Sequence, residues 1–225
     1  MLPLKDNISS SSRPIITYII LGLNVLVFIY GITLGTHLDV FIKQFGAVPY
    51  NIFHPVGLSS YGTLFSSMFM HANLMHIGGN MLFLWIFADN IEDCVGHVMF
   101  IFFYLICGIA GTLLHSIFAP NSTIPMVGAS GAISGVLGAY ILLFPKAKIL
   151  TLVPFFFFRV IQLPSLAFLG IWFLMQFLFG ISSMRASGGG VAYLAHIGGF
   201  LVGLLWAVPY KFKRKKELYE YKIQE

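Results

Sequence analysis

Long stretches without a charged side chain constrain this sequence more than any other feature. A helix needs about 20 mainly apolar residues to cross the roughly 30 Å hydrocarbon core of a bilayer. The sequence holds five such stretches free of Asp, Glu, Lys and Arg, and one of them is long enough for two helices. We therefore predict six spanning helices, at residues 14–34, at about 68–88, two within 94–145 separated by a turn at 119–122, at 164–184 and at 190–210.

The composition supports a membrane protein. Only 9% of the residues are charged, 58% are hydrophobic, and the mean hydropathy is +0.87. So few charges cannot cover a water-facing surface. The predicted fold class is therefore an all-α membrane protein, and the composition excludes a disordered chain, a disulfide framework and a nucleic-acid-binding module.

The basic residues predict the orientation. If both termini are cytoplasmic, eleven of the thirteen basic residues lie inside, and only Lys43 and Arg185 lie outside. We expect three parts: a cytoplasmic segment at 1–13, a six-span domain at 14–210, and a basic cytoplasmic tail at 211–225. In this arrangement residues 35–66 form a long outer loop, and Leu152–Leu163 is too broken to span and lies along the inner interface.

Four polar residues within the predicted spans are the candidate functional residues: His76, Asn80, Ser130 and His196. Ser130 and His196 each lie near the outer start of a span, about 6 Å and 9 Å deep at 1.5 Å per residue. His76 and Asn80 are four residues apart and share one helical face at the outer half of their span. Three spans therefore place distinct chemical groups at one depth.

Each of these residues also has a purely structural interpretation. A serine between glycines commonly allows close helix packing, and an asparagine in a span commonly bonds to a neighbouring helix. A histidine in a span can be packed against a carbonyl or form half of a metal site. Three further histidines lie at or near span ends and are expected to be structural: His71, His97 and His115.

Together the four residues predict a hydrolytic site. Ser130 is the candidate nucleophile and His196 the candidate general base. We expect the Ser130 amide, at a helix N-terminus, to help form an oxyanion hole with His76 and Asn80. No acidic residue lies mid-membrane on the outer side, so the chemistry would use a Ser–His dyad. The sequence also lacks a His-Glu-x-x-His zinc motif and a pair of intramembrane aspartates.

These motifs resemble those of the rhomboid family of intramembrane serine proteases. Gly128-Ala129-Ser130-Gly131 is similar to the family's Gly-x-Ser-Gly nucleophile motif, and Ala195–Gly199 to its last-span histidine motif. The second-span pattern His-x4-His-x3-Asn is matched by His71, His76 and Asn80, and Glu92 falls where the family has an acidic residue. Two departures are Gly62-Thr63, where many members have Trp-Arg, and Ser134, where some have a tyrosine that stacks on the histidine.

The resemblance implies a six-helix bundle with a cavity open to the outside, with Ser130 and His196 as the dyad. It also implies span five near the substrate entrance, transmembrane protein substrates within a lipid bilayer, and no metal or organic cofactor. We expect a multi-pass protein of a bacterial inner membrane that cleaves transmembrane segments near the outer face. The alternatives are a non-proteolytic relative that binds membrane helices, and a small-solute transporter, which the missing repeat symmetry disfavours.

Overall fold

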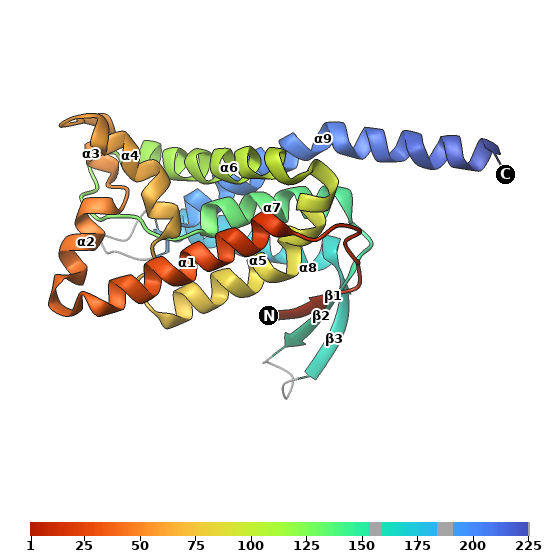
Figure 1. Cartoon of the computed structure of the whole chain (residues 1–225), viewed down its shortest axis with the longest axis horizontal. Coiled ribbons are helices and arrows are strands. Elements are labelled where there is room, and N and C mark those ends of the chain that lie inside the picture. The colour runs from red at the N-terminus through yellow and green to blue at the C-terminus, as the bar shows by residue number, and fades with distance from the viewer. Residues whose placement is uncertain (154–158, 184–190, 225) are drawn as a thin grey trace.

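The computed structural model describes residues 1–153, 159–183 and 191–224, and helices dominate it (Figure 1). Short helices gather at one end of the long helices in Figure 1, and a small sheet lies at the other end, beside the N-terminus. The long helices are α1 (Ile15–Thr33), α5 (Leu74–Val95), α6 (His97–Phe118), α7 (Ser130–Leu143), α8 (Ser165–Ser183) and α9 (Tyr193–Gln224). The shorter helices are η1 (Gly35–His37), α2 (Leu38–Phe45), α3 (Pro49–Phe53), α4 (Leu58–Ser66) and η2 (Ser67–Phe69).

Four helical segments are long and apolar enough to cross a membrane: Ile15–Thr33, His97–Phe118, Ser165–Ser182 and Tyr193–Phe212. Within the described residues, length and hydropathy therefore identify four spanning helices and not the six that were predicted. Helix α7 is apolar but has only 14 residues. Helix α5 has 22 residues, but it includes His76, Asn80 and three acidic residues in its last two turns, which lower its hydropathy.

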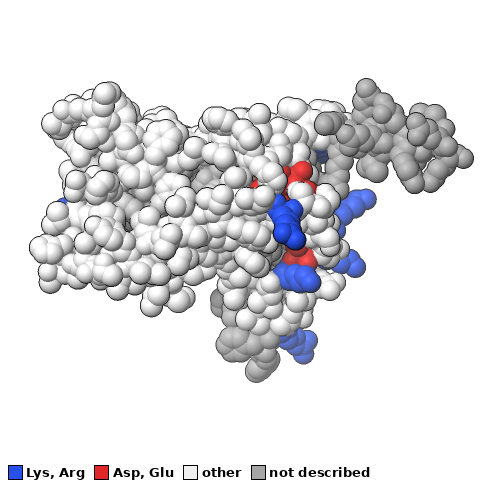
Figure 2. Space-filling model, viewed as in Figure 1, with Lys and Arg blue, Asp and Glu red and all other residues white. Residues whose placement is uncertain are grey.

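The surface of the helices is suited to lipid. Large apolar side chains such as Leu26, Trp85 and Leu205 are more than half exposed. On the face shown in Figure 2, the charged side chains gather mainly at the end that carries the sheet, and the long middle is uncharged. A broad apolar belt with charges at one end is typical of a membrane protein.

Two predicted helix boundaries are corrected by the structure. The second span was expected to begin at about residue 68, but α5 begins at Leu74, because the Asn73 side chain caps it by accepting a hydrogen bond from the His76 amide (2.9 Å). Ser130 was expected to lie about 6 Å inside its span, but α7 begins at Ser130 itself. Gly128, two residues before the start of α7, has φ +127°, which an L-residue with a side chain rarely adopts.

The all-α prediction missed a three-stranded antiparallel sheet. Strands β1 (Leu2–Asp6), β2 (Lys148–Val153) and β3 (Arg159–Pro164) lie in the order β1-β2-β3. The stretch Leu152–Leu163, expected to lie along the interface, therefore contributes to two strands, and its residues 154–158 lie outside the described residues. Segment 1–13, expected only to be cytoplasmic, contains β1, which pairs with residues about 145 positions away.

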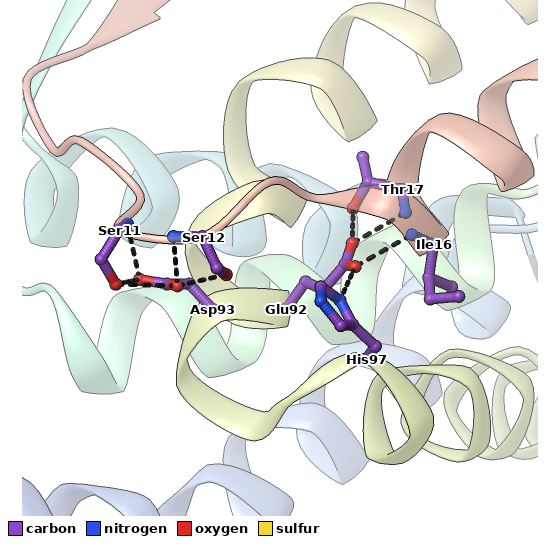
Figure 3. A network of polar contacts seen from close by, with 7 residues as sticks. All are labelled: Ser11, Ser12, Ile16, Thr17, Glu92, Asp93 and His97. Atoms are coloured by element: carbon purple, nitrogen blue, oxygen red, sulfur yellow. Dashed lines mark hydrogen bonds and ion pairs between the residues drawn. The ribbon is translucent and has the colours of Figure 1, made fainter.

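Glu92 ties the end of α5 to the start of α1 (Figure 3). Its fully buried carboxylate accepts hydrogen bonds from the amides of Ile16 (2.9 Å) and Thr17 (2.8 Å) and from the Thr17 hydroxyl (2.6 Å). It also contacts Nδ1 of His97. Because the first amides of a helix have no intrahelical partner, a carboxylate from another helix acts here as the cap of α1.

Two more carboxylates fasten the N-terminal segment to the same end of the helices. Asp93 accepts hydrogen bonds from the amides and hydroxyls of Ser11 and Ser12 (Figure 3). Asp6 of β1 accepts from the Tyr140 hydroxyl of α7 and from the Asn90 amide (3.0 Å) of α5. The segment is thereby joined to α5 and to the C-terminal part of α7.

Helices α7 and α9 pack against each other through glycine. A Cβ atom built on Gly199 or Gly203 of α9 would overlap the main-chain carbonyl oxygen of Gly131 or Gly135 of α7, respectively. Only residues without side chains let two backbones approach so closely. Gly131 follows Ser130 and Gly199 lies three residues after His196, so this contact fixes the distance between the two candidate residues.

Segment 35–66, expected to be an outer loop, is anchored despite its Gly62-Thr63 departure. The Ser66 hydroxyl donates to the Phe45 carbonyl (2.6 Å), which joins α4 to α2. The Ala47 and Met126 main chains form a bridge, and the Gly128 amide donates to the Ser67 carbonyl (2.9 Å). This segment and the turn before Ser130 are therefore held by main-chain contacts and by the Ser66 hydroxyl.

Candidate active site

Ser130 is the first residue of α7, as a consequence of the turn that precedes it. Its amide is one of the helix N-terminal N–H groups that lack an intrahelical acceptor. Its carbonyl accepts a hydrogen bond from the Ser134 hydroxyl (2.6 Å). Ser134 is the residue at which some members of the resembled family have a tyrosine. The Ser130 hydroxyl, by contrast, points to another helix.

The Ser130 hydroxyl and the His196 imidazole are in contact. The distance between Oγ and Nε2 is 2.8 Å, although the residues are 66 positions apart. Ser130 is half-buried, whereas His196 is only 9% exposed, in the first turn of α9. A hydroxyl and an imidazole at this distance can exchange a proton without further movement.

Helix α8 supplies contacts to His196 that the sequence analysis did not identify. Nδ1 of His196 lies 2.7 Å from Oε1 of Gln176. The Trp172 ring, one turn earlier in α8, stacks near the imidazole with the ring centroids 6.1 Å apart. The Tyr193 ring meets it edge-on at 6.3 Å. Trp172 and Tyr193 thus provide ring contacts to His196, although position 134, where some members of the resembled family have a tyrosine, is a serine here.

His76 and Asn80 lie beside the turn before the serine. A Cβ atom built on Gly128 would lie 2.6 Å from His76 Nε2 and 3.6 Å from Asn80 Nδ2, so both side chains face this backbone. Gly128 therefore also provides the space that these two side chains occupy. The structure thus brings all four sequence-predicted residues to one region.

His71, expected to be structural, belongs to this group of side chains. It is buried, its Nε2 lies 2.8 Å from Asn80 Nδ2, and its ring meets that of His76 edge-on with centroids 5.0 Å apart. The asparagine amide carries two N–H bonds, so bonding to His71 leaves one for another acceptor. His97 is elsewhere, paired with Glu92.

The described residues contain no group of three or more His, Cys, Asp or Glu side chains that could hold a metal ion. The histidines near Ser130 contact serine, amides and aromatic rings instead. The fold and the site together define a membrane protein in which a serine–histidine pair lies among apolar helices.

Comparison with known proteins gives the family. The family model of the rhomboid domain matches residues 59–211, which is more than half of the chain. The chain belongs to the rhomboid family. This confirms the resemblance seen in the motifs around Ser130 and His196.

Relatives in this family have different names and compartments. Rhomboid protein 1, mitochondrial, of Saccharomyces cerevisiae is 30% identical over 197 residues, covering 85% of this chain and 52% of the yeast protein. Rhomboid protease GluP of Bacillus subtilis is 30% identical over 130 residues, covering 57% of this chain and 24% of that protein. Inactive rhomboid protein 1 of Drosophila melanogaster is 26% identical over 162 residues, covering 69% of this chain and 10% of the fly protein.

The chain spans about half of the yeast protein and smaller parts of the other two. The family includes a protein named a protease and one named inactive, so membership alone does not establish activity. Several relatives are named mitochondrial, and they give no support to the expected bacterial inner membrane. A membrane protein of the rhomboid family is what the comparisons establish.

Proposed function

We propose that this protein is an intramembrane serine endopeptidase that cleaves transmembrane segments of membrane proteins near the outer face of the bilayer. The observation that carries the proposal is the 2.8 Å contact between Ser130 Oγ and His196 Nε2 among apolar helices. We also propose that α5 and α7 cross the bilayer with the four longer apolar helices, giving six spans, with both termini on the cytoplasmic side.

The geometry supports a two-step acyl transfer. His196 Nε2 accepts the Ser130 hydroxyl proton as Oγ attacks the carbonyl carbon of the scissile peptide bond. The imidazolium then donates this proton to the leaving amine, and an acyl-enzyme forms. A water molecule, activated by the same nitrogen, attacks the ester carbonyl and releases Ser130.

Donors near Ser130 suit the negative charge that develops on the carbonyl oxygen. The Ser130 amide is at the helix N-terminus, and the ring of His76 and the amide of Asn80 lie beside the preceding turn. Donors fixed before the reaction stabilise the transition state without reorganising, and removal of one such donor typically slows an enzyme by about 10²–10³-fold. We assign these three groups to the oxyanion hole.

Cleavage requires a substrate helix to expose a carbonyl to Ser130. Helical segments that contain Gly or Pro unwind at a lower free-energy cost than polyleucine segments, so we expect them to be cleaved faster. Equal cleavage rates for a polyleucine span and for one with a central glycine would contradict this preference.

The test is cleavage of a single-span reporter by the purified protein in proteoliposomes. Ser130→Ala is expected to abolish cleavage, with a loss of at least about 10³-fold, because it removes the hydroxyl that lies against His196 Nε2. Ser134→Ala is the matched control: it removes a hydroxyl one turn along the same helix, which donates to the Ser130 carbonyl and not to His196 in the part of the chain that the structure describes. It should retain most activity.

Undiminished cleavage by Ser130→Ala would remove the proposed nucleophile. If the wild-type protein binds the reporter but leaves it intact, the helix-binding alternative is favoured. A relative from Drosophila melanogaster that is named inactive motivates this alternative.

A further inference from the structure

We infer that Gln176 is a positioning residue that selects the reactive tautomer of His196. The inference rests on the proposed function, because only a base that accepts the Ser130 proton needs a particular tautomer. The key observation is the 2.7 Å contact between Gln176 Oε1 and His196 Nδ1, on the opposite side of the ring from Ser130.

A neutral imidazole carries one proton, on either Nδ1 or Nε2. To accept the Ser130 proton at Nε2, the ring must carry its own proton on Nδ1. That N–H is buried, and a buried donor without an acceptor destabilises the tautomer that carries it. The Gln176 carbonyl oxygen supplies the acceptor and thereby favours the tautomer with a free electron pair facing Ser130.

The amide also suits the charged intermediate. When His196 holds the serine proton, both ring nitrogens are donors, and Gln176 Oε1 continues to accept from Nδ1. The described part of the chain shows no carboxylate in contact with His196. The glutamine therefore orients the ring as the acid of a triad does, but without a full negative charge to stabilise the imidazolium.

The position of Gln176 is set by the packing of α8. Gln176 is only 9% exposed although its sequence neighbours Phe177 and Leu178 are about half exposed. Trp172, four residues earlier, lies on the same helical face and stacks on the same imidazole. One face of α8 thus holds His196 both through a hydrogen bond and through a ring contact.

The experiment compares three variants of the full protein in proteoliposomes. Gln176→Met keeps the length of the side chain and removes the acceptor, so kcat should fall about 10- to 100-fold with KM unchanged. Gln176→Glu restores an acceptor, so kcat should recover relative to the methionine variant. Its charge also favours the imidazolium, and the acidic limb of the kcat/KM profile should move to higher pH by about 1 unit or more.

Asn24→Leu is the control for removing a buried amide from a span. Asn24 bonds within α1, to the Ile20 carbonyl (2.7 Å). The Asn24→Leu variant should leave kcat and the pH profile unchanged. A loss of activity in Gln176→Met that is not rescued by glutamate, or a profile that does not move, would identify Gln176 as a packing residue only.

A second readout does not depend on turnover. The ¹⁵N chemical shifts of His196, assigned by their absence in His196→Ala, report which ring nitrogen is protonated at neutral pH. We expect Nδ1–H in the wild type and a mixture of tautomers in Gln176→Met. Wild-type shifts in the methionine variant would overturn the inference even if Ser130→Ala abolishes cleavage, and the expected shifts would support it even if no reporter is cut.

Discussion

Gly199→Ala tests whether the close approach of α7 and α9 holds the Ser130–His196 pair together. The new methyl group would overlap the main-chain carbonyl oxygen of Gly131, which cannot be moved by a side-chain rotation. The two helices would have to separate by more than about 1 Å to reach an ordinary contact distance. Ser130 and His196 lie on these two helices, next to the contact.

The expected magnitude combines two opposing terms. Overpacking costs about 1–3 kcal/mol, and the upper end applies because the obstacle is main chain. Alanine in place of glycine contributes about 1 kcal/mol of helix propensity in the other direction. We expect Gly199→Ala to lower the free energy of unfolding by about 2 kcal/mol. Misplacement of the dyad by about 1 Å should lower kcat about 100-fold.

The assay is reversible unfolding in mixed micelles of rising SDS content, together with reporter cleavage. Gly22→Ala in α1 is the matched control, because a Cβ atom there meets nothing within 4 Å. It should stabilise the protein by about 0.5–1 kcal/mol and leave kcat unchanged. If both alanine variants were stabilised, or if Gly199→Ala kept full activity, the argument from close packing would be refuted.

Three further predictions concern the carboxylates that join the N-terminal segment to the helices and the buried His71. Glu92→Gln should lower the unfolding free energy by about 3 kcal/mol, since charge-assisted hydrogen bonds to a buried carboxylate are about twice as strong as neutral ones, whereas Asp93→Asn, nearer the surface, should cost about 1 kcal/mol. Burial raises the pKa of Asp6 above its usual 3.8, so its folded form binds a proton more tightly than its unfolded form. Its contribution to stability is therefore full below pH 3.8 and lost as pH rises through the folded pKa, and Asp6→Asn should remove this slope from unfolding measured against pH. His71→Ala removes the acceptor for the Asn80 amide and should lower kcat about tenfold with a smaller change in KM.

Each of these predictions has an opposing outcome. Equal destabilisation by Glu92→Gln and Asp93→Asn would show that burial of the cap is unimportant. A wild-type pH slope that persists in Asp6→Asn would assign the effect to another group. Unchanged kcat in His71→Ala would return His71 to a packing role.

Charge-free stretches were sufficient to locate most of the long helices. The boundaries of α1, α6 and α8 follow the predicted limits closely, because their ends coincide with polar turns or charged residues. The start of α5 was misplaced by six residues because it depends on a side-chain cap at Asn73, which hydropathy does not register. The start of α7 was misplaced because it depends on the backbone of Gly128.

The sheet could not be predicted from local pattern. Strand β2 pairs with β1 across about 145 residues, and the phenylalanine-rich stretch after β2 is equally suited to a membrane interface. Nothing in either segment alone identifies the other as its partner. Long-range pairing of short strands is decided by the packed helices that bring them together.

The candidate site was largely predictable because its residues carry their own chemistry. Ser130 and His196 are unusual in apolar helices, and their depths agree. Gln176 was missed because an amide in a span commonly serves helix packing. A signal was available: Gln176 lies seven residues before the end of α8, about 10 Å deep, which matches the depth predicted for His196.

The pairing of β1 with β2 also bears on biosynthesis. The chain is made from its N-terminus, so residues 2–6 are synthesised long before residues 148–152, with which they form hydrogen bonds. The cap of α1 likewise waits for Glu92. Until then these backbone groups are satisfied by water or by other proteins at the site of translation. The end of the molecule that carries the sheet is therefore completed only after most of the long helices have been synthesised.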